Sequence, residues 1–173
     1  MRRLMLMLLF IAALPAIALP QGTSTWRADM PCGKECRAQG NRPEEAWLVL
    51  VVKGKLVCGS IDQDYGLATA NRSPSGNFAG KLVQAVAVVG YTDSFADPAL
   101  FGTAAIFPKD GGLRWATAIP TPIGYLAPDQ LRFRRGSAQR SGQEDPTAEV
   151  RTACERYFQD QSSNPARTYL ESQ

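Results

Sequence analysis

The sequence predicts a mainly β domain, in which a single antiparallel sheet, curved or closed into a small barrel, carries a C-terminal α-helix packed on it. Three observations support this fold class. Runs rich in Val, Ile, Thr and aromatic residues recur along the chain between clusters of Gly, Pro, Asn and Asp. Glycines inside these runs are typical of bends in a curved sheet. A segment with helical spacing of its apolar residues follows the last run.

The first 18 residues have the three parts of an export signal. Arg2 and Arg3 are followed by an apolar run from Leu4 to Leu14 and by the small-residue motif Ala16-Ile17-Ala18. This run is shorter than the roughly 18 apolar residues that a membrane-spanning helix needs. We therefore expect residues 1–18 to be a cleaved signal peptide, and the mature protein to be periplasmic or secreted, without a membrane anchor.

The next residues, 19–43, are polar and rich in Gly, Pro and charge, and they predict an irregular lead-in to a folded domain at 44–161. Glu45–Val52 is apolar at both alternating positions, which favours a strand covered on both sides. Lys53-Gly54 predicts a tight turn into a partner strand, Lys55–Ile61, because glycine adopts positive φ without steric cost.

The middle of the chain predicts a loop, a long strand and a short helical turn. Asp62–Gly76 is dense in turn residues and predicts the loop. Asn77–Tyr91 predicts one long strand with bends at Gly80 and Gly90. Asp97–Gly102 has Asp at the N-cap, Pro at the first position and Gly after the last, which predicts one helical turn.

Two more strands are predicted at Thr103–Phe107 and Leu113–Ile119, joined by a hairpin turn at Pro108–Gly112. Leu131–Arg135 predicts a final edge strand, and Gly136–Glu144 a flexible connection.

A helix is predicted after this connection. Asp145 suits the N-cap and Pro146 the first turn. Apolar residues follow at helical spacing and should pack on the sheet, namely Val150, Ala153, Cys154, Tyr157 and Phe158. We expect residues 162–173 to form a flexible tail.

Four cysteines remain after the expected cleavage, Cys32, Cys36, Cys58 and Cys154. An even number in an oxidising compartment favours two disulfides, and three connectivities stay open. Cys154 must pair with a residue far back in the chain, which would tie the helix to the sheet. A zinc site would need two close cysteine pairs, whereas only Cys32 and Cys36 are close, so we expect no metal.

Cleavage would remove two arginines and no acid, which lowers the formal net charge from +3 to +1. A nearly neutral chain has no overall field to attract nucleic acid, so we expect no such partner. The one basic patch, Arg132, Arg134, Arg135 and Arg140, is typical of a solvated strand surface.

The chain contains no histidine. This removes the Ser-His-Asp and Cys-His nucleophile systems and imidazole metal sites. Neither a phosphate-binding glycine loop nor a Gly-x-Ser-x-Gly motif is present. We therefore assign no catalytic residue and no cofactor. An enzyme could still use paired carboxylates, as in glycoside hydrolysis. Candidates are Asp62 with Asp64 and Glu44 with Glu45, which are equally typical of solvated loops.

The segment Ser73–Phe78 resembles the Ser-x-Ser-Gly-x-x-Tyr loop of bacterial periplasmic inhibitors of c-type lysozyme, with the aromatic residue one position earlier here. The resemblance implies a small disulfide-bonded β-barrel, with Ser75 inserted into the cleft of the enzyme and Phe78 behind it. The same segment is also typical of a turn into the next strand. Tyr65 and Trp26 lie outside the predicted strands and are candidates for exposed contacts. The candidate binding residues are Tyr65, Ser73, Ser75 and Phe78.

Long loops on a rigid sheet are where binding residues concentrate. We therefore expect a soluble, exported binding or inhibitor module, or an immunity protein, without catalysis. Its partner would be a protein such as an exported hydrolase or toxin. The alternatives are a carboxylate-dependent hydrolase of envelope glycan and a calycin-like carrier of a small ligand, which would need an apolar cavity.

Overall fold

The structure is a computed structural model. It describes residues 18–30, 34–40, 44–64, 75–93, 101–120, 130–138 and 144–159. The expected signal peptide up to residue 17 and the expected tail lie outside these residues. So do Cys32, Tyr65, Ser73 and Arg140.

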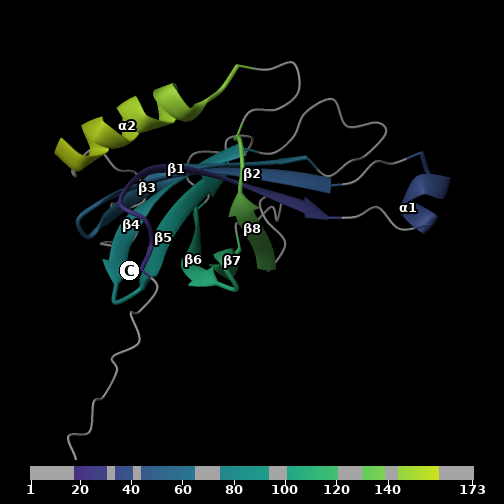
Figure 1. The fold of residues 1–173 in the computed structure, drawn as a ribbon, viewed down its shortest axis with the longest axis horizontal. Coiled ribbons are helices and arrows are strands. Elements are labelled where there is room, and N and C mark those ends of the chain that lie inside the picture. Colours follow the sequence, from purple (N-terminus) through teal and green to yellow (C-terminus); the bar gives the residue numbers. More distant parts are fainter. Residues whose placement is uncertain are drawn as a thin grey trace, which may run out of the picture.

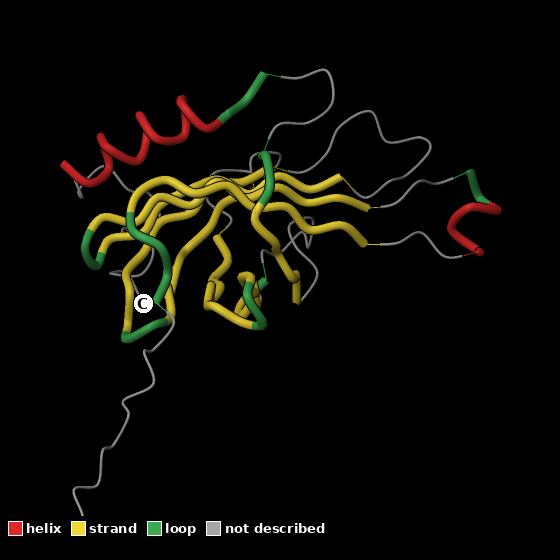
Figure 2. Tube along the Cα trace, viewed as in Figure 1, coloured by secondary structure: helices red, strands yellow, loops and turns green. Residues whose placement is uncertain are grey.

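Antiparallel strands form a closed barrel in which each strand pairs with its neighbours in sequence and β1 pairs with β8. The strands are β1 (Gly22–Met30), β2 (Glu44–Lys53), β3 (Leu56–Asp64), β4 (Ser75–Val83), β5 (Val86–Asp93), β6 (Phe101–Lys109), β7 (Gly112–Ile119) and β8 (Gln130–Arg135). Figures 1 and 2 show the curvature of these strands around the core. The prediction of a mainly β small barrel with a C-terminal helix is confirmed.

The up-and-down strand order separates two kinds of connection. Tight turns join the strands at one end of the barrel, which we name the tight-turn end, at 54–55, 84–85 and 110–111. The longer connections all join strands at the opposite, long-connection end, at 31–43, 65–74, 94–100 and 120–129. The short helix α1 (Lys34–Ala38) belongs to the first of these and lies beyond the ends of β1 and β2 (Figure 1).

Alternating side chains fill the interior of the barrel with aromatic rings. The ring of Trp115 meets those of Phe78 and Tyr91 edge to face, at centroid distances of 5.6 and 5.4 Å. Two glycines make room for these rings. Gly59 on β3 is the register partner of Phe78, and Gly102 on β6 is the register partner of Tyr91. A Cβ atom on Gly59 would lie 2.4 Å from Cζ of Phe78, and one on Gly102 would lie 2.3 Å from Cζ of Tyr91. Any larger residue at either position would displace a ring.

The helix α2 (Thr147–Gln159) lies on the outside of the barrel (Figure 1). As predicted, Asp145 caps it, because its Oδ1 accepts a hydrogen bond from the Thr147 N–H at 2.9 Å. The Thr147 hydroxyl and N–H hydrogen bonds hold the pKa of Asp145 below its ordinary value. One face packs on outward side chains of β2, β3 and β4, using Val150, Cys154, Tyr157 and Phe158. Ala153, expected on that face, is exposed.

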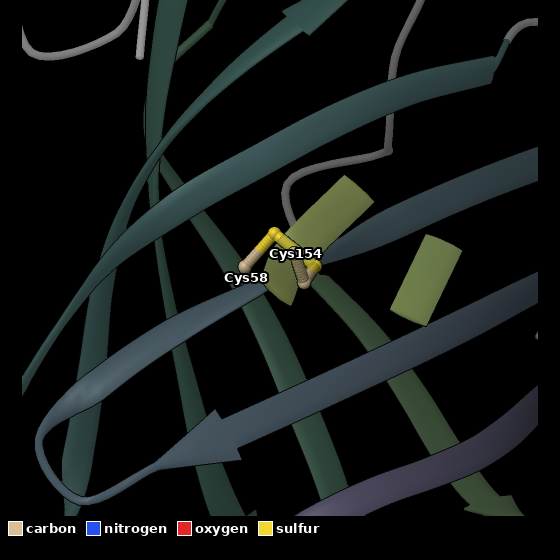
Figure 3. Close-up of a disulfide and its surroundings, with 2 residues drawn as sticks. All are labelled: Cys58 and Cys154. Atoms are coloured by element: carbon tan, nitrogen blue, oxygen red, sulfur yellow. A yellow bond between two sulfur atoms is a disulfide. The ribbon is translucent and has the colours of Figure 1, made fainter. Parts of the chain in front are cut away.

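A disulfide joins Cys58 on β3 to Cys154 on α2, with Cα atoms 5.6 Å apart (Figure 3). This confirms that Cys154 pairs far back in the chain and ties the helix to the sheet. The bond is compatible with an exported protein. The expected second disulfide stays a prediction, because Cys32 and the side chain of Cys36 lie outside the described residues. Across the described ranges, no helix is long and apolar enough to cross a membrane.

The prediction of an irregular lead-in is wrong for Gly22–Met30, which forms β1. Its inward positions hold Ser24, Trp26 and Ala28, all buried. Because Ser24 is polar, the alternation of inward apolar and outward polar residues is not evident in the sequence. Inside the barrel, the Trp26 Nε1–H donates to the Ser24 hydroxyl at 2.9 Å, which satisfies both polar groups. Trp26 is therefore a core residue and not an exposed contact.

The single strand predicted for Asn77–Tyr91 is two strands, β4 and β5, joined by a turn at residues 84–85. Gln84 has φ 58°, so this hairpin lacks the glycine or asparagine signal that turns with positive φ usually carry. Gly80 does not mark a bend. A Cβ atom there would lie 1.9 Å from the Val88 carbonyl oxygen, so glycine permits close approach of the paired strands.

Three further boundaries differ from the prediction. Leu131–Arg135 is not an edge, because β8 pairs with β7 on one side and with β1 on the other. Phe101-Gly102 begins β6, and the rest of the predicted helical turn lies outside the described residues. The predicted loop at Asp62–Gly76 is shorter, because β3 continues to Asp64 and β4 begins at Ser75.

Removing the disulfide should destabilise the barrel strongly. The bridge spans 96 residues, and closing a loop of that size lowers the entropy of the unfolded chain by an amount worth about 4 kcal/mol. We expect Cys58→Ser/Cys154→Ser to lose that much free energy of unfolding in urea titrations of the oxidised proteins. Reduced wild-type protein serves as a comparison and should be at least as destabilised as the variant, because reduction also breaks the expected second disulfide. A loss below about 1 kcal/mol would contradict the prediction.

Adding a methyl group at Gly102 should strain the core. We expect Gly102→Ala to lower the free energy of unfolding by about 2 to 3 kcal/mol, because the Tyr91 ring must move within a packed interior. The matched control is Gly136→Ala, whose Cβ atom would lie 3.3 Å from that of Arg27. Chemical denaturation compares the two variants, and equal losses would argue against the close contact at Gly102.

Candidate functional site

The two ends of the barrel differ in charge. At the long-connection end, the last two residues of the strands include several acidic residues and no basic residue. The acidic residues are Asp29, Glu44, Glu45, Asp64 and Asp93. The corresponding positions at the tight-turn end hold Lys53, Lys109, Arg134 and Arg135, and no acidic residue. Position along the strands therefore places acidic residues toward one end and basic residues toward the other, except at the contact of β1 with β8, where Arg134 pairs with Asp29.

A row of register partners crosses the strands obliquely, from the second-last residue of β8 to the first residue of β4, which lies at the long-connection end. Arg134 of β8 pairs with Arg27 of β1, which pairs with Trp47 of β2. Trp47 pairs with Asp62 of β3, which pairs with Ser75 of β4. The row therefore brings together Asp62 and Ser75, which the sequence suggested for two different functions.

Ion pairs connect Arg27 of this row to acidic residues on β1 and β2. The Arg27 guanidinium donates to Asp29 at 2.7 Å and to Glu45 at 2.6 Å. It also lies over the Trp47 ring, 5.9 Å from the centroid. Arg134 pairs with the second oxygen of Asp29. The hydrogen bond that Arg27 donates to Asp29 and the negative charge of Glu45 raise the pKa of Arg27 above its ordinary value, against the opposing effect of burial.

The candidate binding residues fall in different places. Phe78 is buried inside the barrel against Trp115, so it is a core residue. Ser75 is the first residue of β4, and its side chain lies outside the described residues, as do Tyr65 and Ser73. The Tyr91 hydroxyl donates to the Ile119 carbonyl oxygen at 3.4 Å, which links the aromatic layer to the end of β7.

Of the candidate carboxylates, Asp62 and Glu45 lie on the outer wall of the barrel, and the side chains of Glu44 and Asp64 lie outside the described residues. Asp62 follows the buried Ile61, so alternation directs it outward. Asp64 is the register partner of Glu45. Glu45 is already bonded to Arg27. In the part of the chain that the structure describes, no three His, Cys, Asp or Glu side chains gather as a metal-binding group. The wall thus offers charged groups for surface contacts.

The basic patch of the sequence is divided between the two faces of β8. Arg132 and Arg134 alternate with the buried Leu131 and Phe133 and are exposed. Arg135 is the register partner of Trp26, and its guanidinium lies 4.3 Å from the centroid of that ring. Sequence reasoning missed this contact. The alternation of Ser24, Trp26 and Ala28 was the signal that could have placed Trp26 inside the barrel.

Comparison of the chain with protein-family models, curated proteins and solved structures gives no match.

The ion pairs of Arg27 should contribute modestly to stability. We expect a double-mutant cycle of Arg27→Gln and Glu45→Gln to give a coupling energy of about 0.5 kcal/mol, because both side chains are about one-third exposed and solvent screens them. Denaturation at low and at high NaCl measures this coupling. It should shrink as ionic strength rises. A coupling that is unchanged by salt would show that the interaction is not mainly electrostatic.

Proposed function

We propose that this protein is an exported binding module that holds a protein partner through its long-connection end. The observation that carries the proposal is the strand order, which gathers the four longer connections at one end of a rigid barrel. Recognition residues concentrate on loops that a rigid scaffold positions. An inhibitor of an exported hydrolase, or an immunity protein against an exported toxin, is the specific form of this function.

Charge at the same end supports a partner with a cationic contact surface. Besides Asp29 and Glu45, which are paired with Arg27 and Arg134, the strand ends there carry the acidic residues Glu44, Asp64 and Asp93. Complementary potentials accelerate association and orient the partner. Ser75 adjoins Asp62 in the register, so the segment that resembles an inhibitor loop enters the sheet beside an acidic residue. Phe78, three residues after Ser75, is buried in the core of the barrel.

The interior supports surface binding over the calycin-like carrier. An eight-stranded barrel is just wide enough for its side chains or for one small ligand. Here the rings of Trp26, Phe78, Tyr91 and Trp115, each at most 4% exposed, lie inside. The position of Asp62 on the outer wall, beside Trp47, likewise supports binding over carboxylate catalysis, which requires two carboxyl groups that flank a substrate.

The test is capture of a partner from periplasmic extract with the mature chain, followed by calorimetry on the purified pair. We expect Tyr65→Ala/Ser75→Ala to weaken binding at least tenfold, about the effect of losing one strong contact residue. The control Lys53→Ala/Lys55→Ala changes the tight-turn end and should bind as the wild type does.

Two results would overturn the proposal. One is a partner that both variants bind with equal affinity, which would place the contact elsewhere. The other is hydrolysis of envelope glycan that Asp62→Ala/Asp64→Ala abolishes, because this would identify a carboxylate enzyme. Saturable uptake of a fluorescent apolar probe by the wild type would instead favour the carrier.

A further inference from the structure

A shallow pocket of about 180 Å³ lies between β7 and β8 near the tight-turn end, away from the long-connection end. The turn between β6 and β7, the first residues of β7 and the middle of β8 line it. The lining consists of Lys109, Asp110, Gly111, Gly112, Leu113, Arg114, Arg132, Phe133 and Arg134.

The pocket arises because β8 changes its partner at this point. The pairing of β7 with β8 ends at Leu113 and Phe133, and the next residues of β8 pair with β1. The β6–β7 hairpin continues beyond that point through a turn in which Asp110 and Gly111 have φ of 51° and 75°. A Cβ atom on Gly112 would lie 2.2 Å from the Phe133 carbonyl oxygen, so this glycine lets the two strands approach.

Cationic side chains dominate the lining. Arg114 and Arg132 are direct register partners on the outer face, and like charges in that relation destabilise a sheet. Lys109 and Arg134 add two more positive charges. Within the described residues, Asp110 is the single carboxylate of the lining, and Asp29 already bonds Arg134 from the β1 side.

We infer that this pocket binds a phosphate group. Guanidinium groups present planar pairs of N–H donors that match phosphate oxygens, and each such charge-assisted hydrogen bond is stronger than a neutral one. Two guanidinium groups and the Lys109 ammonium around one pocket suit a group with two negative charges better than a carboxylate with one. The inference does not depend on the proposed partner site, because the pocket lies between β7 and β8, although Arg134 in its lining also bonds Asp29 of β1.

The outer surface beside the pocket carries apolar side chains together with Lys81, the register partner of Val88, and it indicates two sources of the phosphate. Phe107, the register partner of Arg114, is half-buried, and Val88 and Val83 on the neighbouring hairpin are 50% and 59% exposed. A lipid headgroup would place its phosphate among the arginines and its apolar part along these side chains. A free phosphate compound would use the arginines alone.

Two binding measurements on the mature protein distinguish these sources. Calorimetry with inorganic pyrophosphate tests the free anion. Co-sedimentation with vesicles of phosphatidylglycerol, with phosphatidylcholine vesicles as the comparison, tests the lipid. For whichever ligand binds, pyrophosphate or phosphatidylglycerol vesicles, we expect Arg132→Gln to weaken binding at least tenfold. The loss of one charge-assisted hydrogen bond accounts for a change of that size. Lys109→Gln should also weaken binding of the same ligand.

The matched control is Arg151→Gln, the same change on the exposed side of α2, which should bind as the wild type does. Val88→Ser should weaken vesicle binding without affecting pyrophosphate. Circular dichroism verifies that the variants stay folded, which is expected because Arg132 is exposed. The inference is overturned if neither pyrophosphate nor phosphatidylglycerol binds saturably, or if Arg132→Gln and Arg151→Gln bind equally well.

Discussion

Closure of the barrel between β1 and β8 is the interaction on which the other features of the structure depend. The register pairs Trp26 with Arg135 and Arg27 with Arg134, and the Gly136 N–H donates to the Thr25 carbonyl oxygen. Side chains reinforce this short seam on both faces. The Arg135 guanidinium covers the Trp26 ring inside, and Arg134 bonds Asp29 outside. Without the seam, both strands would be unprotected sheet edges, which are prone to pair with other chains.

The seam also explains how the two candidate sites arise. A closed up-and-down barrel forces alternate connections to opposite ends, so longer connections and acidic strand ends gather together while tight turns and basic strand ends gather opposite. At the basic end, β8 must leave β7 to reach β1, and this divergence creates the pocket beside Arg114 and Arg132. The same geometry that protects the sheet edges therefore positions both the surface that we propose for a protein partner and the pocket that we propose for an anion.

The strands with strong local signals were predictable from the sequence. The β2–β3 hairpin has an apolar run and a glycine turn, and α2 has a cap and a regular apolar face. The missed elements depend on contacts between distant residues. Ser24 looks like a loop residue until Trp26 satisfies its hydroxyl, and Gln84 gives no sign of its positive φ. For the site, Asp62 and Ser75 were each identified, but only the register of β3 with β4 makes them neighbours.

The bond between Cys58 and Cys154 also determines how the molecule would respond to mechanical tension. It encloses β4 to β8 and nearly all of β3 in one covalent loop, and leaves β1 and β2 outside it. A force that pulls the two chain ends apart is carried across the sulfur atoms, so the looped strands cannot be extended. The seam between β1 and β8 and the hydrogen bonds of β2 bear the load instead. The barrel would therefore open at its closing strand while the rest of the sheet stays folded.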